Sequence, residues 1–180
     1  MQSTGAYHSK LESPQLIGNM GMLPIRSNFK GPAARIDGED IIDESLAYFK
    51  PNIFFREFEI KSAADRTLIY LTFYIIECLR KLQRAQYEQI EWTERFGSTR
   101  SQPPTPHSWR TNLSPKQHAP ANKAEEETMR GYLLQLRQEL GARLCELAFP
   151  DPNQKASKWW MCFARKRFMD KGLVAQGITL

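Results

Sequence analysis

The fold of this chain depends most on the segment from Ser62 to Gln83, which reads S-A-A-D-R-T-L-I-Y-L-T-F-Y-I-I-E-C-L-R-K-L-Q. From Leu68 to Ile76 every position except Thr72 is apolar or aromatic, so a helix here would leave no face for water. Such a helix must be wrapped by other parts of a protein or by lipid. The run is far shorter than the roughly 20 residues that a membrane span needs, and Arg66 and Glu77 bracket it. The sequence therefore predicts a buried central helix.

The ends of this segment carry helix signals. Ser62 followed by Asp65 makes a capping-box pattern. Lys81 and Arg84 lie near the other end, where cations suit the negative end of a helix. The β-branched and aromatic content would also suit a strand, but a length of about 20 residues favours a helix, because strands rarely exceed about 10. We expect the central helix at about residues 62–86.

A first helix is expected to begin at about residues 37–40 and to run to Phe49. Acidic residues fill its first turn, where they suit the positive helix end, and apolar residues repeat at helical spacing. Pro51 is expected to end it. Before it, residues 1–38 alternate glycines and prolines with short apolar clusters, which indicates an irregular segment lying over the core.

Two more helices are expected in the second half. Asn122 is a good N-cap for a helix whose leucines recur every three or four residues, and Pro150 stops it. Ser157 caps a last helix, K-W-W-M-C-F-A-R-K-R-F-M-D-K, with Gly172 placed as its C-terminal stop. The leucine stripe favours core burial over partner binding, because the central helix needs several apolar walls.

Residues 95–120 differ in composition from the rest of the chain. Five prolines among many serines and threonines argue against a helix or a central strand, so we expect an irregular, mobile loop within a single domain of residues 1–180. Pro103 to Pro106 fits the P-x-x-P ligand pattern, and Ser114-Pro115 resembles a site for proline-directed kinases. Both patterns are short and occur often by chance, so a plain loop is the better interpretation.

The composition is typical of a soluble globular protein. The 180 residues are enough for a core, with 41% hydrophobic and 25% charged residues. The N-terminus lacks the apolar core of a signal peptide. Cys78, Cys145 and Cys162 are odd in number, widely spaced and in apolar helical contexts. They indicate reduced thiols in a cytosolic protein rather than disulfides or a zinc site.

Sequence motifs for catalysis are absent. No phosphate loop, dinucleotide fingerprint or H-E-x-x-H motif occurs. His8, His107 and His118 all lie in irregular segments, which hold catalytic groups poorly. We therefore predict that the chain is not an enzyme and that it has no catalytic residues, no cofactor and no metal ion.

The formal net charge of +5 is unevenly placed. Residues 151–180 hold six basic and two acidic residues, a local excess of +4, which suggests an acidic partner surface. Trp159 and Trp160 beside these cations could stack on bases, or they could close the core. The core interpretation is favoured for at least one of them, because large aromatics dominate core burial. The cations fit partner contact and a solvated face about equally well.

A series of longer motifs runs along the chain in order. They are A-Y-H-S (6–9), L-I-G-N-M (16–20), L-P-I-R-S-N-F-K-G-P-A (23–33), E-I-K-S-A-A-D-R-T-L-I-Y (59–70), E-C-L-R-K-L-Q (77–83), P-A-N-K (120–123), M-R-G-Y-L-L-Q-L-R-Q-E-L-G-A-R-L-C-E (129–146) and S-K-W-W-M-C-F-A-R-K-R-F-M (157–169). With them the chain resembles the family of the third, small subunit of the actin-related protein 2/3 complex. Between about residues 86 and 119 it departs from the family, with a Ser/Thr/Pro/Arg-rich sequence in place of a smoother loop, so contacts of that loop do not transfer.

The resemblance implies an all-α fold, which agrees with a wrapped central helix, and a non-enzymatic role. Members of this family belong to a seven-subunit assembly that contains two actin-related proteins, and they mainly contact the larger one. When nucleation-promoting factors activate the assembly, it starts a daughter actin filament on a mother filament. The implied location is the cytoplasm and the actin cytoskeleton, including actin-rich projections, and the implied partners include neither nucleic acid nor membrane.

We expect the N-terminal segment and the basic C-terminal helix to form the docking surface. Its candidate residues are Arg26, Lys30, Lys158, Arg165, Lys166 and Arg167. Two rival functions remain, a nucleic-acid-binding module suggested by a pI near 9.2 and a proline-motif adaptor. Neither explains the ordered motifs.

Overall fold

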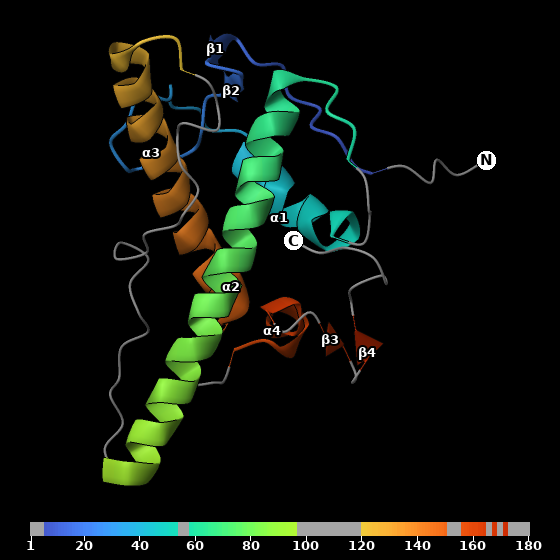
Figure 1. Cartoon of the computed structure of the whole chain (residues 1–180), viewed down its shortest axis with the longest axis vertical. Helices are drawn as coiled ribbons and strands as arrows, with labels where there is room; N and C mark the ends of the chain where they lie inside the picture. The colour runs from blue at the N-terminus through green and yellow to red at the C-terminus, as the bar shows by residue number, and fades with distance from the viewer. Residues whose placement is uncertain are drawn as a thin grey trace, which may run out of the picture.

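The fold is mostly helical and is organised around one long helix. The computed structural model describes residues 6–53, 58–96, 120–150 and 156–164, with the backbone of 167–168 and 171–172. The helices of this part are α1 (Ile41–Asn52), α2 (Ala63–Phe96), α3 (Lys123–Ala148) and α4 (Lys158–Ala164). The strands are β1 (Gln15–Ile17), β2 (Met20–Met22), β3 (Arg167–Phe168) and β4 (Lys171–Gly172). Figure 1 shows α2 running the length of the molecule beside α3, with both helices starting at the same end.

Helix α2 confirms the predicted central helix at its start and extends it at its end. The hydroxyl of Ser62 accepts the backbone N–H of Asp65 at 3.1 Å, as an N-cap does. The helix continues to Phe96, well beyond the predicted end near residue 86. The added residues include good helix formers such as Gln and Glu, and the first helix breaker is Gly97.

One strip of α2 is open to water, so the prediction of burial on all sides was wrong there. Leu71 and Ile75 are fully buried, whereas Phe73 is 39% exposed. Helices α1, α3 and α4 and strand β2 pack against α2. Among the described residues, no helix is both long and apolar enough to cross a membrane.

Helix α1 starts as predicted but ends later. Asp40 is its N-cap: its carboxylate accepts the N–H groups of Ile42 at 3.0 Å and Asp43 at 2.9 Å. Pro51 lies inside the helix rather than ending it. The last turn still closes, because the N–H of Ile53 donates to the carbonyl of Phe49 at 3.0 Å and Pro51 lacks only its own N–H.

Two short antiparallel hairpins correct the prediction of an all-α fold. In the first, Ile17 pairs with Met20 across a turn of Gly18 and Asn19, and Gly18 has a φ of 56°. Gly-Asn is a favoured pair for such two-residue turns, a signal that our sequence analysis missed. The hydroxyl of Thr67 in α2 donates to the carbonyl of Gly21 at 2.8 Å and fixes this hairpin to the start of the central helix.

The second half confirms α3 and shortens α4. The side chain of Asn122 accepts the N–H of Glu125 at 2.8 Å, and the leucine stripe is buried from Leu133 to Leu144. Helix α4 ends at Ala164, and the short hairpin of β3 and β4 takes the place of the predicted continuation to Gly172. At helical spacing, Lys166 and Arg167 would continue the buried face formed by Trp160 and Phe163. Burying these cations without partners would be costly, which opposes a longer helix. The loop predicted for 95–120 falls almost entirely outside the described residues, except that 95 and 96 belong to α2.

Candidate partner-binding surface

The six basic residues predicted to bind a partner come from different parts of the molecule. Arg26 and Lys30 lie on the segment between β2 and α1, and Arg26 contacts α3. Lys158 is the first residue of α4, which follows the end of α3 (Figure 1). Arg167 lies in β3, and residues 165 and 166 lie outside the described residues. That these six residues bind one partner together therefore remains a prediction.

Arg26 is held by its backbone and extends its side chain outwards. Its N–H donates to a carboxylate oxygen of Asp40 at 2.8 Å, and its carbonyl accepts from Arg143. Its guanidinium lies 3.2 and 3.3 Å from the two carboxylate oxygens of Asp43, and its side chain is 52% exposed. An exposed pair of this kind contributes only about 0–1 kcal/mol. A partner carboxylate can therefore compete for Arg26.

Lys30 lies on a loop that Gln135 of α3 ties down. The Gln135 side chain accepts the N–H of Ala33 at 3.0 Å and donates to the carbonyl of Phe29 at 3.0 Å. A Cβ on Gly31 would overlap the Gln135 side chain, so this close approach requires glycine. Lys30 itself is exposed, so a fixed loop presents its charge to solvent.

The two adjacent tryptophans have different environments. Trp160 is 7% exposed, stacks on Phe49 with ring centroids 5.9 Å apart, and has the Lys50 ammonium 4.4 Å from its ring centre. This confirms the prediction that at least one tryptophan closes the core. Trp159 is 65% exposed beside the exposed Lys158. Tryptophan is enriched in protein–protein interfaces, which makes Trp159 a further contact candidate.

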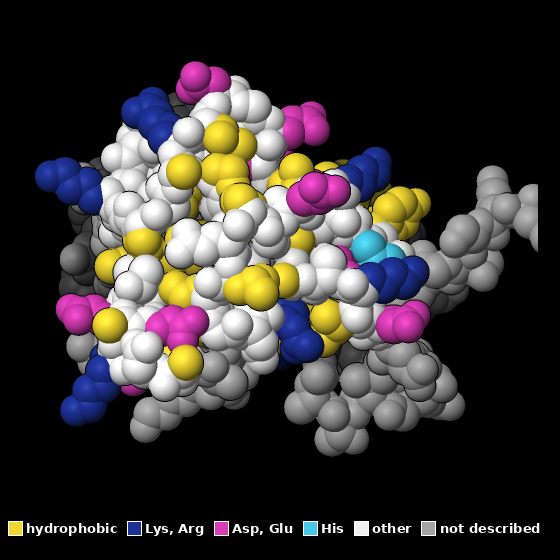
Figure 2. Space-filling model, turned by 90° about the horizontal axis from the view of Figure 1, so that it is seen from above, with side chains coloured by type: hydrophobic (Ala, Val, Ile, Leu, Met, Phe, Trp, Pro, Cys, Tyr) yellow, Lys and Arg dark blue, Asp and Glu magenta, His cyan; other side chains and the backbone are white. Residues whose placement is uncertain are grey.

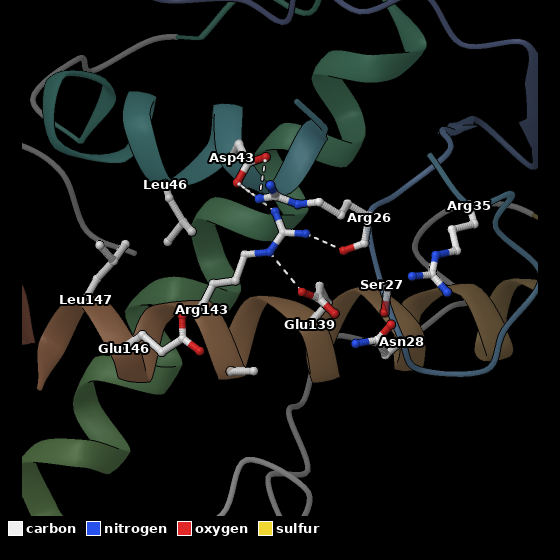
Figure 3. Close-up of a pocket in the computed structure, with 11 residues that line it drawn as sticks. Arg26, Ser27, Asn28, Arg35, Asp43, Leu46, Glu139, Arg143, Glu146 and Leu147 are labelled. Atoms are coloured by element: carbon white, nitrogen blue, oxygen red, sulfur yellow. Dashed lines mark hydrogen bonds and ion pairs between the residues drawn. The ribbon is translucent and has the colours of Figure 1, made fainter. Parts of the chain in front are cut away.

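A groove between α1 and α3, which our sequence analysis missed, has a volume of about 530 Å³ (Figure 3). We call it the α1–α3 groove. Both helices and the segment before α1 contribute to its walls. Its lining residues are Arg26, Ser27, Asn28, Arg35, Asp43, Leu46, Glu139, Ala142, Arg143, Glu146 and Leu147.

Arg143 is the centre of an ion-paired network in this groove. Its Nε donates to Glu139 at 2.9 Å, and its two terminal nitrogens reach both carboxylate oxygens of Asp40 at 2.8 and 2.9 Å. They also reach Asp43 at 2.7 Å and the carbonyl of Arg26. All five N–H donors of the guanidinium are thereby used. In the sequence Arg143 lies between Leu140 and Leu144 of the leucine stripe, but this local pattern does not show which carboxylates it meets.

Both partners of the central pair are charged at neutral pH. Asp40 is fully buried. Burial alone would raise the pKa of its carboxyl, but hydrogen bonds from Arg143 and from the N–H groups of Asp43 and Arg26 outweigh burial and hold the pKa below its usual 3.8. Burial alone would lower the pKa of Arg143, yet the contacts with Asp40 raise it overall. The network is therefore a permanent joint between the start of α1 and the C-terminal half of α3.

A second joint fixes the A-Y-H-S motif to the start of α2. The buried carboxylate of Asp65 accepts the N–H groups of Ser9 and Lys61, each at 2.9 Å, and lies 3.0 Å from Nδ1 of His8. Asp65 thus serves these groups instead of closing the predicted capping box. Burial opposes ionisation, but these hydrogen bonds hold the pKa of Asp65 below its usual 3.8. The Ser9 hydroxyl donates to Glu44 of α1 at 2.6 Å, so the motif connects α1 with α2.

The described polar side chains that are buried form joints between elements of the fold. In the part of the chain that the structure describes, no group of three or more His, Cys, Asp or Glu side chains is arranged to hold a metal ion. All three cysteines are free, and burial raises the pKa of each thiol, which lowers its reactivity. Fold and site together define a mostly helical protein whose helices are joined by buried ion pairs and hydrogen bonds.

Comparison with known proteins identifies the family. The family model of the 21 kDa ARPC3 subunit of the ARP2/3 complex, P21-Arc, matches residues 4–173. The probable actin-related protein 2/3 complex subunit 3 of Caenorhabditis elegans is 56% identical, covering 97% of this chain and 99% of that protein. Subunit 3 of Schizosaccharomyces pombe is 41% identical and that of Dictyostelium discoideum 39% identical, each over 93% of this chain and 99% of the relative. The chain belongs to this family, and the predicted resemblance is confirmed.

Proposed function

We propose that this chain is a non-catalytic structural subunit of the actin-related protein 2/3 complex that supports the nucleation of branched actin filaments. The observation that carries the proposal is the family match over residues 4–173, joined by relatives that align along nearly their whole length. Its partners are the two actin-related proteins and the other subunits, and it reaches actin filaments through the complex. Its place is the actin cytoskeleton of the cytoplasm, including actin-rich cell projections.

Within the complex, the basic residues of the chain dock onto the larger actin-related protein. Arg26 and Lys30 support this role because their backbones are fixed while their side chains reach solvent. Lys158 supports it because Trp159, a large exposed aromatic side chain, lies next to it. The charge excess of residues 151–180 suits an acidic partner surface. The rival function of nucleic-acid binding gains no support from the family match.

Affinity capture of the tagged full chain from cells, with mass spectrometry of the captured proteins, tests both statements. The wild-type chain is expected to recover both actin-related proteins and the other subunits. The triple variant R165E/K166E/R167E is expected to recover about tenfold less, because each reversal replaces an attraction by a repulsion. The matched control is K10E/K61E/K123E, which makes the same charge change at exposed residues.

The outcomes distinguish the proposed function as a subunit from the proposed basic docking surface. A folded wild-type chain that recovers none of the subunits contradicts the proposed function. Recovery of the complex by the wild type and equally by the triple variant at physiological salt contradicts only the basic docking surface.

A further inference from the structure

One end of the α1–α3 groove carries a positive charge that no described neighbour neutralises. Arg35 is exposed and has no ion pair or hydrogen bond from its guanidinium to a described residue. The backbone of Arg35 is fixed by an isolated parallel β-bridge to Ile25. The N–H of Ile25 donates to the carbonyl of Ala34 at 2.9 Å, and the N–H of Ile36 donates to the carbonyl of Ile25 at 3.3 Å. Figure 3 shows the Arg35 guanidinium extending toward Asn28 at this end of the groove.

The other end is apolar and carries an uncompensated negative charge. Leu46 of α1 and Leu147 of α3 point toward each other there, and Leu147 is 46% exposed (Figure 3). Glu146, also exposed, has no partner among the described residues and lies in the last turn of α3, which contains no basic residue. A carboxylate is disfavoured at this negative end of a helix. A cation from outside the chain would relieve that cost.

The groove is preformed between these two ends. Every N–H donor of Arg143 is already bonded within the chain. The proposed contacts of an occupant are with Arg35, Leu46, Leu147 and Glu146, so they leave these bonds in place. The opposite charges of the two ends exclude a purely anionic occupant, because the carboxylates of Glu139 and Glu146 would repel a run of phosphates. A polypeptide segment supplies a carboxylate, an apolar side chain and a cation together.

We propose that the α1–α3 groove receives a segment of another subunit of the complex. The segment places a carboxylate on Arg35, an apolar side chain between Leu46 and Leu147, and a lysine or arginine on Glu146. This inference rests on the proposed function, because the segment belongs to the assembled complex. Arg26 lines the same groove, so the occupied surface is continuous with the basic docking residues.

Competitive incorporation in cells tests the groove. Differently tagged wild-type and variant full chains are expressed together, and their ratio in the purified complex is compared with that in the lysate. R35E and E146K are each expected to enter the complex about tenfold less well than the wild type. K123E and E59K make the same charge changes at exposed positions outside the groove and are expected to enter as well as the wild type. None of the four should melt below the wild type, because none of these side chains has a described intramolecular partner. E146K should melt slightly above it, because the variant places a cation at the negative end of α3.

Chemical footprinting adds a readout of direct contact. Modification of Arg35 by phenylglyoxal and carbodiimide coupling at Glu146 are expected to be several-fold slower in the purified complex than in the isolated chain. If the wild type enters the complex while R35E and E146K match their controls and both residues react at unchanged rates, the groove is unoccupied and the inference is wrong. A wild-type chain that enters no complex instead overturns the proposed function, and this inference with it.

Discussion

Arg143 is the residue on which the joint between α1 and α3 depends. Its side chain is only 11% exposed and faces Asp40, which is fully buried. Replacing one member of a buried pair leaves the other charge without compensation, which costs far more than the intact pair contributes. Arg26 makes a superficially similar pair with Asp43, but its side chain is half exposed.

We therefore expect Arg143→Met to lower the free energy of unfolding by about 3–5 kcal/mol. Arg26→Met is the matched control and should cost less than about 1 kcal/mol. Urea unfolding of the two full-length variants measures both values. Equal losses for the two variants would contradict the buried network.

Gly31 is a second position where one atom matters. Gly31→Ala would push a Cβ into Gln135 and break the two hydrogen bonds that tie the loop around Lys30 to α3. We expect a loss of about 1–3 kcal/mol in the free energy of unfolding. Gly38→Ala is the control, because a Cβ there meets nothing within 4 Å, and it should stay within about 1 kcal/mol of wild type. Thermal melting that ranks the two variants in the opposite order would refute this account.

At the scale of elements, the N-terminal segment depends on one carboxylate at the start of α2. The pKa of Asp65 is lowered on folding, so its contribution to stability is complete above its unfolded value of about 3.8 and is lost as the pH falls through the lower folded value. The ionised form is the one that accepts from Ser9 and Lys61.

Asp65→Asn should consequently cost about 1–3 kcal/mol at neutral pH. The difference from wild type should shrink as the pH falls below 3.8, because the folded pKa lies lower than that value. The measurement is urea unfolding of both proteins across the range from pH 7 to 2. Asp37→Asn, at an exposed position, should show little difference at any pH. A constant difference between Asp65→Asn and wild type down to the lowest pH would show that the carboxylate charge has no part in the joint.

The starts of elements could be predicted from sequence better than their ends. Ser62, Asp40 and Asn122 cap their helices through hydrogen bonds to residues two or three positions later, so the signal is local. Pro51 was misread because a proline in a last turn loses one hydrogen bond without ending the helix. The end of α4 depends on which side chains α1 and α2 can bury, and local pattern does not supply that information.

At the scale of the whole molecule, Cys78 reports on global unfolding. It is fully buried in the core, and burial raises the pKa of its thiol, which disfavours the reactive thiolate in the native state. We expect a thiol reagent to modify Cys78 only through global opening, and Arg143→Met to raise that rate by about a hundredfold or more. Cys162, which is only partly buried, should react faster in both proteins. Equal rates for Cys78 and Cys162 in the native wild type would contradict a single closed core around α2.

The sequence by itself determined the central helix, the helix starts, the non-catalytic character and the family, because capping, periodicity and ordered motifs are properties of neighbouring residues. Only the tertiary structure decided the α1–α3 groove and its network. Arg143 is 103 residues from Asp40 and 100 from Asp43, and their contact depends on how α3 packs against α1. It also decided that Trp160 is buried while Trp159 reaches solvent. Interactions at such separations are set by helix packing, which a local pattern does not encode.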